Sequence, residues 1–250
     1  MINQLRVQGD GDGQPVLLLL HGLGATGDVW NPWRPLLARH WPGRWLAPDL
    51  PGHGGSAALP SYSFESLAAG IAEMLDPGDR LIVLGHSLGG VLGLALAGED
   101  FNLSVTAVVG LGTKVAWSAD ELAKARALAQ RPVTWFASRD EAAVRYLRVS
   151  GLAGLLDADD PAVYAGLREQ DGKWRLAMDP GSFAVGAPDM VGLLGGSRAP
   201  VLLARGERDP MVSDEHLARL GVPVRTLPGL GHNAHVEDPV AVLGLITPYA

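Results

Sequence analysis

The sequence contains no cysteine among its 250 residues. That absence excludes disulfides, thiolate nucleophiles and cysteine-ligated metals, and it leaves the redox compartment undecided. Basic residues are also in the minority, because 20 lysines and arginines face 27 acidic residues, and the formal charge is −7. General binders of nucleic acid or of anionic membranes need a basic face, so we expect neither kind of partner.

Long apolar segments are absent as well. The first strongly apolar run, Val16–Leu20, has the length of one strand, whereas a bilayer-spanning helix needs ~20 residues. The first ten residues are polar and lack the apolar stretch of a secretory signal. The sequence therefore predicts a cytoplasmic protein without a membrane span.

Apolar residues are nevertheless plentiful, at 47% of the chain against 19% charged residues. This composition can bury a sizeable core and differs from that of disordered chains. The length fits one core with an insertion. The 33 glycines and 18 prolines indicate many tight turns, and no internal repeat accompanies them.

Short apolar runs recur along the chain, and glycine or proline followed by helical sequence separates them. Nearly continuous apolar runs are typical of strands buried on both faces of a parallel sheet. Alternation of such strands with helices, here 65–75 and 91–97, indicates an α/β fold. The predicted strands are Val16–Leu20, Trp45–Ala47, Leu81–Leu84, Val105–Val109, Pro200–Ala204 and Val222–Thr226.

Between residues 114 and 196 this alternation stops, and only helix signals remain. Capping-box patterns occur at Ser118–Glu121 and Ser138–Glu141, and Asp160 precedes a proline suited to the first helical position. The segment is too long for one crossover helix. We therefore predict a core in two parts, residues 1–113 and 197–250, with a helical cap, residues 114–196, inserted between them.

The strongest chemical signal is the sequence Gly85-His-Ser87-Leu-Gly89, set directly between a predicted strand and a predicted helix. In that context a Gly-x-Ser-x-Gly motif predicts a strained turn that lifts the serine hydroxyl to the carboxyl edge of the sheet. The positive end of the following helix points at the same place. Ser87 is therefore the candidate nucleophile.

A second glycine-rich turn, His21-Gly-Leu23-Gly24, follows the first buried strand. A free amide at Leu23 can pair with the amide of Leu88 to hold a developing oxyanion. His21 itself is expected to anchor this loop by hydrogen bonds rather than to act as a base.

A serine nucleophile needs a general base and an acid that orients the base. Asp209 and His232 follow the two last predicted strands, and the chain order Ser, Asp, His fits a known triad order. The competing acids have other expected roles, because Asp214 and Asp238 lie at helix starts and Glu207 lies at a strand end.

The remaining histidines fit structural roles. His53 lies in a glycine-rich loop, His86 packs beside the nucleophile or lines the pocket floor, and His235 lies in the turn after His232. His40 and His216 fit exposed helix positions. Because no pair has convincing ligand spacing with carboxylate support, we expect no catalytic metal.

Taken together, these motifs resemble the α/β-hydrolase superfamily, in its serine-nucleophile branch with a helical cap, which includes esterases, lipases and carbon–carbon hydrolases. The matching segments are His21–Gly24, Ala47–Ser56, Gly85–Gly89, Gly206–Asp209 and Gly231–His232. The resemblance implies an α/β-hydrolase fold, with a mostly parallel central sheet flanked by helices and an inserted helical cap.

The resemblance also assigns roles to residues. It implies Ser87 as the nucleophile, Asp209 and His232 as its relay, and the amides of Leu23 and Leu88 as the oxyanion hole, with no cofactor. Serine at position 87 argues against haloalkane dehalogenases and epoxide hydrolases, whose similar motif carries aspartate.

The motifs and the resemblance together predict hydrolysis of a carboxylic ester, thioester or lactone of a small, largely apolar substrate. Carbon–carbon bond hydrolysis of the meta-cleavage type and cofactor-free haloperoxidase activity are the alternatives. Asn233 after His232 weakens the former, because many of those enzymes have tryptophan there. A non-catalytic ligand-binding member of the fold is a further alternative. Substrate, pathway and oligomeric state stay open.

Aromatic side chains of the cap and of the segment after the oxyanion loop favour an apolar or aromatic acyl group over a highly charged one. The residues predicted to line the pocket are Trp30, His86, Trp117, Trp135, Phe136 and Tyr146.

Overall fold

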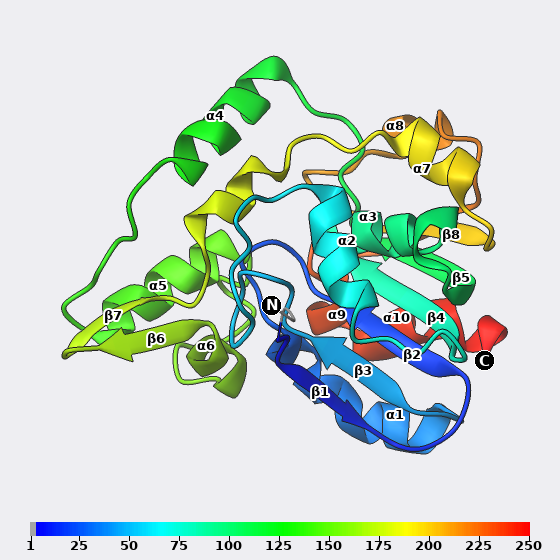
Figure 1. Cartoon of the computed structure of the whole chain (residues 1–250), viewed down its shortest axis with the longest axis horizontal. Coiled ribbons are helices and arrows are strands. Elements are labelled where there is room, and N and C mark those ends of the chain that lie inside the picture. The colour runs from blue at the N-terminus through cyan, green and yellow to red at the C-terminus, as the bar shows by residue number, and fades with distance from the viewer. Residues whose placement is uncertain (1–3) are drawn as a thin grey trace.

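The computed structural model describes residues 4–250, and within that range the core is a seven-stranded sheet (Figure 1). Six strands are parallel, and β1 pairs with β3 in the antiparallel sense at one edge. This arrangement confirms the predicted mostly parallel sheet. In spatial order the strands are β1 (Val7–Asp10), β3 (Trp45–Pro48), β2 (Val16–Leu20), β4 (Arg80–His86), β5 (Ser104–Leu111), β8 (Val201–Gly206) and β9 (Val224–Leu227).

The central strands are apolar throughout because both of their faces are buried. Along β2, every residue from Val16 to Leu20 is fully buried. Each predicted strand is present within a few residues of its expected ends. The edge strand β1 was not predicted, because its sequence is polar and mostly exposed.

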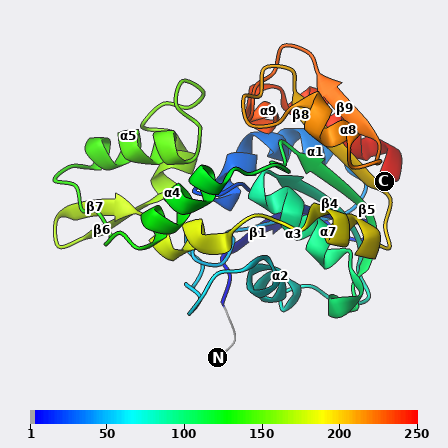
Figure 2. The ribbon, with the colours of Figure 1, turned by 90° about the horizontal axis from the view of Figure 1, so that it is seen from above.

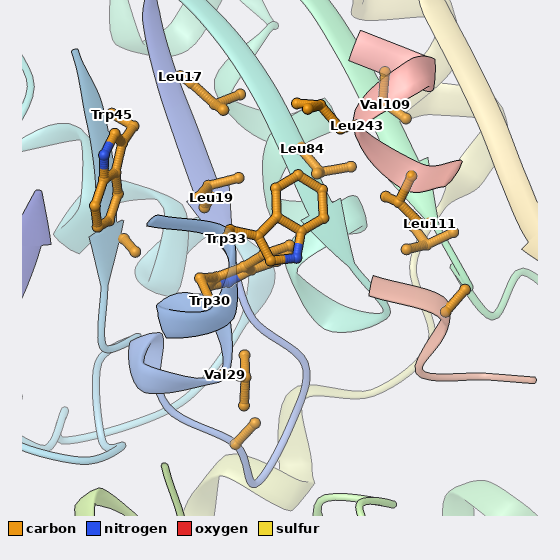
Figure 3. Packing of buried hydrophobic residues seen from close by; sticks show 14 of the residues in the cluster. Leu17, Leu19, Val29, Trp30, Trp33, Trp45, Leu84, Val109, Leu111 and Leu243 are labelled. Carbon is orange, nitrogen blue, oxygen red and sulfur yellow. The ribbon is translucent and has the colours of Figure 1, made fainter. Parts of the chain in front are cut away.

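Helices cover both faces of the sheet (Figure 2). Leu17 and Leu19 of β2 face a cluster that includes Trp30 and Trp33 (Figure 3), whereas Leu18 faces the opposite cluster. The first face is covered by η1 (Gly27–Trp33), α1 (Arg34–His40) and α10 (Pro239–Ile246), and the second by α2 (Phe64–Ala72), α3 (Leu88–Leu96) and α7 (Met190–Gly196).

Shorter helices complete the loops around the sheet. They are η2 (Glu99–Phe101), α8 (Asp214–Ala218), α9 (Ala234–Glu237) and η4 (Thr247–Tyr249). Within the part of the chain that the structure describes, no helix is long and apolar enough to cross a membrane.

The inserted segment begins with the predicted helices α4 (Ala119–Ala129), α5 (Arg139–Val149) and α6 (Pro161–Ala165), and η3 (Pro180–Val185) follows later. Ser118, Ser138 and Asp160 cap the first three, each accepting a backbone N–H with its side chain. Glu121 completes the first box by accepting the Ser118 N–H at 2.8 Å. The first residues of these three helices therefore lie where the capping patterns in the sequence predicted them.

The segment also contains a hairpin, so the expectation of helices alone was wrong. Strands β6 (Leu167–Gln170) and β7 (Lys173–Leu176) pair in the antiparallel sense. Asp171 and Gly172 turn the chain between them with φ of 51° and 73°. Asp-Gly is a strong signal for such a two-residue turn. The flanking strands are partly exposed and are not continuous apolar runs, so the pattern typical of buried strands is absent there.

Helix α7 lies at the end of the inserted segment but packs with the core. Met190 of α7 shares a buried cluster with Leu94 of α3 and Val108 of β5. The part that projects beside the sheet therefore comprises α4 to η3 (Figure 2). The division of the chain at residues 113 and 196 stays a prediction, and this packing favours placing α7 with the sheet.

Candidate active site

Ser87 occupies the turn between β4 and α3 that the sequence predicted. Its φ of 51° and ψ of −113° lie outside the helical and extended regions, a backbone conformation that L-residues adopt only under constraint. The Ser87 N–H donates to the carbonyl oxygen of Leu111 on β5 at 2.8 Å. This bond ties the turn to the neighbouring strand at the carboxyl edge of the sheet.

The two glycines of the motif permit close backbone contacts on either side of the turn. A Cβ at Gly85 would lie 2.1 Å from the carbonyl oxygen of Gly89, and a Cβ at Gly89 would lie 2.4 Å from that of Leu20. Helix α3 therefore reaches the ends of β2 and β4 only because neither position has a side chain.

His232 and Asp209 lie on the loops after β9 and β8, and their side chains meet. The Nδ1 atom of His232 lies 2.8 Å from Oδ2 of Asp209, whose side chain is fully buried. The other carboxylate oxygen of Asp209 accepts the Met211 N–H at 2.8 Å. With Nδ1 as the donor, the Nε2 atom of His232 is free to act as a base.

The competing acids are engaged elsewhere. Glu207 accepts the Gly229 N–H at 2.8 Å. Asp214 pairs with Arg205 at 2.9 Å, and this pairing lowers the pKa of Asp214. Asp238 caps α10 by accepting the Ala241 N–H at 3.0 Å. Among these four acids, Asp209 is the one that contacts His232.

Leu23 and Leu88 both border the cavity that contains Ser87. Among the hydrogen bonds of residues 4–250, none has either backbone amide as its donor. The amide of Leu88 is also the first of α3, where the helix dipole favours negative charge. Both amides are thus available to an oxyanion, and the predicted pairing stays a prediction.

The cavity at this site has a volume of about 260 Å³ and lies between the sheet edge and the inserted segment. Ser87, His232, His86 and Trp117 are among its lining residues, so two of the predicted pocket residues lie there. The rest of the wall is largely apolar. It includes Phe64, Val91, Val149, Val185, Pro188 and Met211.

Trp117 is held at the wall by Lys114, whose ammonium lies 4.4 Å from the indole ring and also pairs with Glu121. The indole N–H of Trp117 is buried and has no acceptor among the described residues. A buried donor without an acceptor carries a desolvation cost. Arg148 of α5 borders the same cavity.

The other four predicted pocket residues do not line this cavity, so that part of the prediction is corrected. Trp30 and Tyr146 are fully buried in the core cluster. Phe136 pairs through its backbone with Trp174 of β7 and borders a separate small cavity. Trp135 is 40% exposed and lines a groove on the other side of the hairpin.

Several lining residues escaped the sequence analysis. Val149 and Gly151 come from the end of α5, and Val185 and Gly186 come from the end of η3. Their one sequence signal is position, because each lies at or just after the end of a helix of the inserted segment. Side chains of this type line pockets and cores alike, so composition does not separate them.

His86 packs between His232 and His235, with ring centroids 4.7 Å and 4.3 Å away. Its Nε2 atom lies 3.0 Å from the backbone carbonyl oxygen of His232, to which it donates. Burial and the two neighbouring imidazoles hold the pKa of His86 well below its usual range. A neutral His86 therefore supports the His232 backbone without adding charge to the site.

Three further histidines are buried near the loops of the site. His21 donates to the Gly22 carbonyl at 2.8 Å and accepts the Leu50 N–H at 2.9 Å, so it anchors its loop as expected. Burial lowers the pKa of His21 to about 4 and those of His53 and His235 to about 3. All three are neutral at physiological pH.

Residues 4–250 contain no evident metal site. No group of three or more histidine and acidic side chains there is arranged to hold a metal ion.

Comparison with known proteins identifies a family and several similar enzymes. The model of the alpha/beta hydrolase family matches residues 17–245. A 2-succinyl-6-hydroxy-2,4-cyclohexadiene-1-carboxylate synthase from Yersinia enterocolitica is 29% identical, over 94% of this chain and 86% of that protein. A pimeloyl-[acyl-carrier protein] methyl ester esterase from Klebsiella pneumoniae is 35% identical, over 38% of this chain and 36% of that one.

A solved structure extends the similarity. The crystal structure of E-2-(acetamidomethylene)succinate hydrolase superposes with a TM-score of 0.81 at 25% identity, and the match covers 98% of this chain and 94% of that one.

The close approach of Gly85 to Gly89 yields a stability prediction. Gly85→Ala should lower the free energy of unfolding by more than about 2 kcal/mol, because the added methyl group overlaps a backbone carbonyl. Gly244→Ala, in α10 with open space around it, should raise that free energy by up to about 1 kcal/mol. Urea denaturation measures both changes, and equal stability of the two variants would contradict the close packing.

The buried neutral histidines make stability depend on pH. In the unfolded chain their pKa is about 6.5, whereas the folded values for His21, His53 and His235 are about 3 to 4. The unfolded state therefore takes up protons that the folded state excludes. The contribution of these histidines to the free energy of unfolding should be constant above about pH 6.5. It should fall steadily from there towards pH 4, by about 3 kcal/mol for His21 alone.

His53→Gln isolates one of these groups, since glutamine can still donate to the Pro51 carbonyl that His53 contacts. Plotted against pH between 6 and 4, the unfolding free energy of this variant should fall less steeply than that of the unmodified protein. His40→Gln, on the exposed end of α1, is the matched control and should keep the original slope. An unchanged slope in His53→Gln would refute the assignment.

Proposed function

Because the chain belongs to the alpha/beta hydrolase family, we propose that this hydrolase cleaves a carboxylic ester, thioester or lactone through an acyl-enzyme on Ser87. The contact that carries the proposal is the 2.8 Å hydrogen bond between His232 and the buried Asp209. It lies beside a cavity that contains both Ser87 and His232. No cofactor takes part in the proposed reaction.

In the first half of the reaction, Nε2 of His232 takes the proton of the Ser87 hydroxyl while the serine oxygen attacks the substrate carbonyl carbon. The carbonyl oxygen becomes an oxyanion, which the amides of Leu23 and Leu88 stabilise. Asp209 stabilises the imidazolium cation. The tetrahedral intermediate then collapses, and His232 returns the proton to the departing alcohol or thiol.

In the second half, water attacks the acyl-serine and His232 takes the water proton. Collapse of this second intermediate releases the acid and returns the proton to Ser87. The cavity wall favours an apolar acyl group of modest size, because valine, methionine, proline and phenylalanine side chains contribute to a largely apolar lining.

A second candidate function comes from the relatives matched over nearly the whole chain. They are 2-succinyl-6-hydroxy-2,4-cyclohexadiene-1-carboxylate synthases at 28–29% identity, and the same site is the proposed location of such an activity here. Formation of that named compound without hydrolysis of any ester would favour the synthase. Carbon–carbon hydrolysis and cofactor-free haloperoxidase activity lack a comparable supporting observation.

The direct test of the proposed reaction is a substrate panel. p-Nitrophenyl esters of increasing chain length, thioesters, lactones and a ring-cleavage dienoate should be assayed with the purified protein. We expect ester or thioester hydrolysis to be fastest with short to medium apolar acyl groups. Hydrolysis of the dienoate alone would instead indicate a carbon–carbon hydrolase, and inactivity on the whole panel would contradict the proposal.

Replacement of the orienting acid tests the relay. Asp209→Asn should fold and bind substrate but lose about 10⁴ in kcat, as in the serine-protease example of this substitution. The asparagine amide can donate where the imidazole needs an acceptor, so His232 takes the wrong tautomer. Glu207→Gln and Asp214→Asn should keep kcat within about tenfold. If either of these variants loses activity while Asp209→Asn keeps it, the relay is wrongly assigned.

A further inference from the structure

A groove of about 780 Å³ lies outside the site described above, between the loop after β3 and the β6–β7 hairpin. Its lining residues do not overlap with those of the cavity at Ser87. Two arginines, Arg168 and Arg175, and one partly exposed indole, Trp135, contribute to its wall. None of these residues takes part in the proposed hydrolysis.

Arg168 and Arg175 are register partners on the two strands of the hairpin, so their side chains lie on the same face. Like charges directly opposite each other destabilise a strand pair. Burial and the charge of Arg168 together lower the pKa of the Arg175 guanidinium. The hairpin therefore maintains two adjacent positive charges at an energetic cost.

Each guanidinium is fixed by a backbone carbonyl and not by a counter-ion. Arg168 donates to the carbonyl of Gly54, and Arg175 donates to that of Leu176 at 3.0 Å. Among the described residues, neither guanidinium has a carboxylate within salt-bridge distance. Because a guanidinium has five N–H donors, both arginines keep donors for another acceptor.

Two acidic residues border the groove but have other partners. Asp179 accepts the Tyr62 hydroxyl at 2.9 Å and the Gly181 N–H at 2.8 Å. Glu169 accepts the Gly172 N–H at 2.7 Å, in the hairpin turn. On the strand, Glu169 also pairs with Trp174 rather than with an arginine. Neither carboxylate neutralises the arginine pair by direct contact.

Trp135 adds an apolar surface to the charged pair. Its side chain is 40% exposed, and the Arg175 guanidinium lies 5.7 Å from the centre of the indole ring. Val133, also partly exposed, continues this surface along the same wall. An aromatic group placed against Trp135 therefore lies next to the guanidinium donors.

From this juxtaposition we propose that the groove binds a phosphate monoester carried on an aromatic body. A phosphate monoester has nearly two negative charges at pH 7 and three acceptor oxygens, which match two guanidinium groups in charge and in donor geometry. Its aromatic part stacks on Trp135. The site is independent of the hydrolytic reaction and is formed by the hairpin, Trp135 and the loop after β3.

Calorimetric titration of phenyl phosphate into the full-length Ser87→Ala variant tests the proposal without turnover. We expect one site per chain, weaker binding of inorganic phosphate and benzoate, and a loss of affinity as ionic strength rises. Arg175→Gln and Arg168→Gln should each weaken phenyl phosphate binding at least tenfold. Trp135→Ala should bring phenyl phosphate to the affinity of inorganic phosphate.

Arg126→Gln is the matched control, because Arg126 is an exposed arginine of α4 that does not line the groove and should bind like the parent. When the groove substitutions are made in protein that retains Ser87, ester hydrolysis should stay that of the parent. Retained hydrolysis shows that these variants fold, and it separates this test from the test of the hydrolase. Equal binding by Arg175→Gln and Arg126→Gln would overturn the proposal, as would the absence of any phenyl phosphate binding.

Discussion

Between β4 and α3 the chain reverses direction at a single residue, with Ser87 held at a positive φ of 51° and no room for a Cβ at Gly85 or Gly89. This turn brings the start of α3 against the ends of β2 and β4. The remaining elements of the site follow from the same sheet edge, because parallel strands end there together. Asp209 and His232 reach the edge on the loops after β8 and β9, and their hydrogen bond fixes the imidazole beside the turn.

Support for that edge comes from neutral polar groups as much as from apolar packing. His86 and His21 are buried, uncharged and hydrogen-bonded to backbone groups of the loops that carry His232 and Leu50. Burial disfavours the protonated imidazolium forms of both histidines. Their hydrogen bonds therefore stabilise the loops near neutral pH, and this stabilisation is lost in acid. Stability and the geometry of the site thus depend on the same histidines.

The sheet, the capped helices and the order of the candidate triad were predictable because their signals are local. A buried strand, a helix start and the serine turn can each be recognised from a few neighbouring residues: a continuous apolar run, an N-cap serine and a glycine-flanked serine. The walls of the cavity were not predictable in this way. Trp30 and Tyr146 pack inward against segments far away in the sequence, and aromatic composition does not encode the direction of a side chain. The hairpin was locally encoded at Asp171–Gly172, but its strands lack a buried apolar run.

The proposed reaction requires that the Ser87 oxygen forms a covalent acyl-enzyme. Incubation with a fluorophosphonate, followed by mass spectrometry of the proteolytic peptides, tests it most directly, because the reagent needs an activated serine and not a particular substrate. We expect one adduct, located on Ser87 and lost in Ser87→Ala, and the far-ultraviolet circular dichroism of Ser87→Ala should match that of the parent. An adduct on another residue, or no adduct on folded protein that hydrolyses esters, would contradict it.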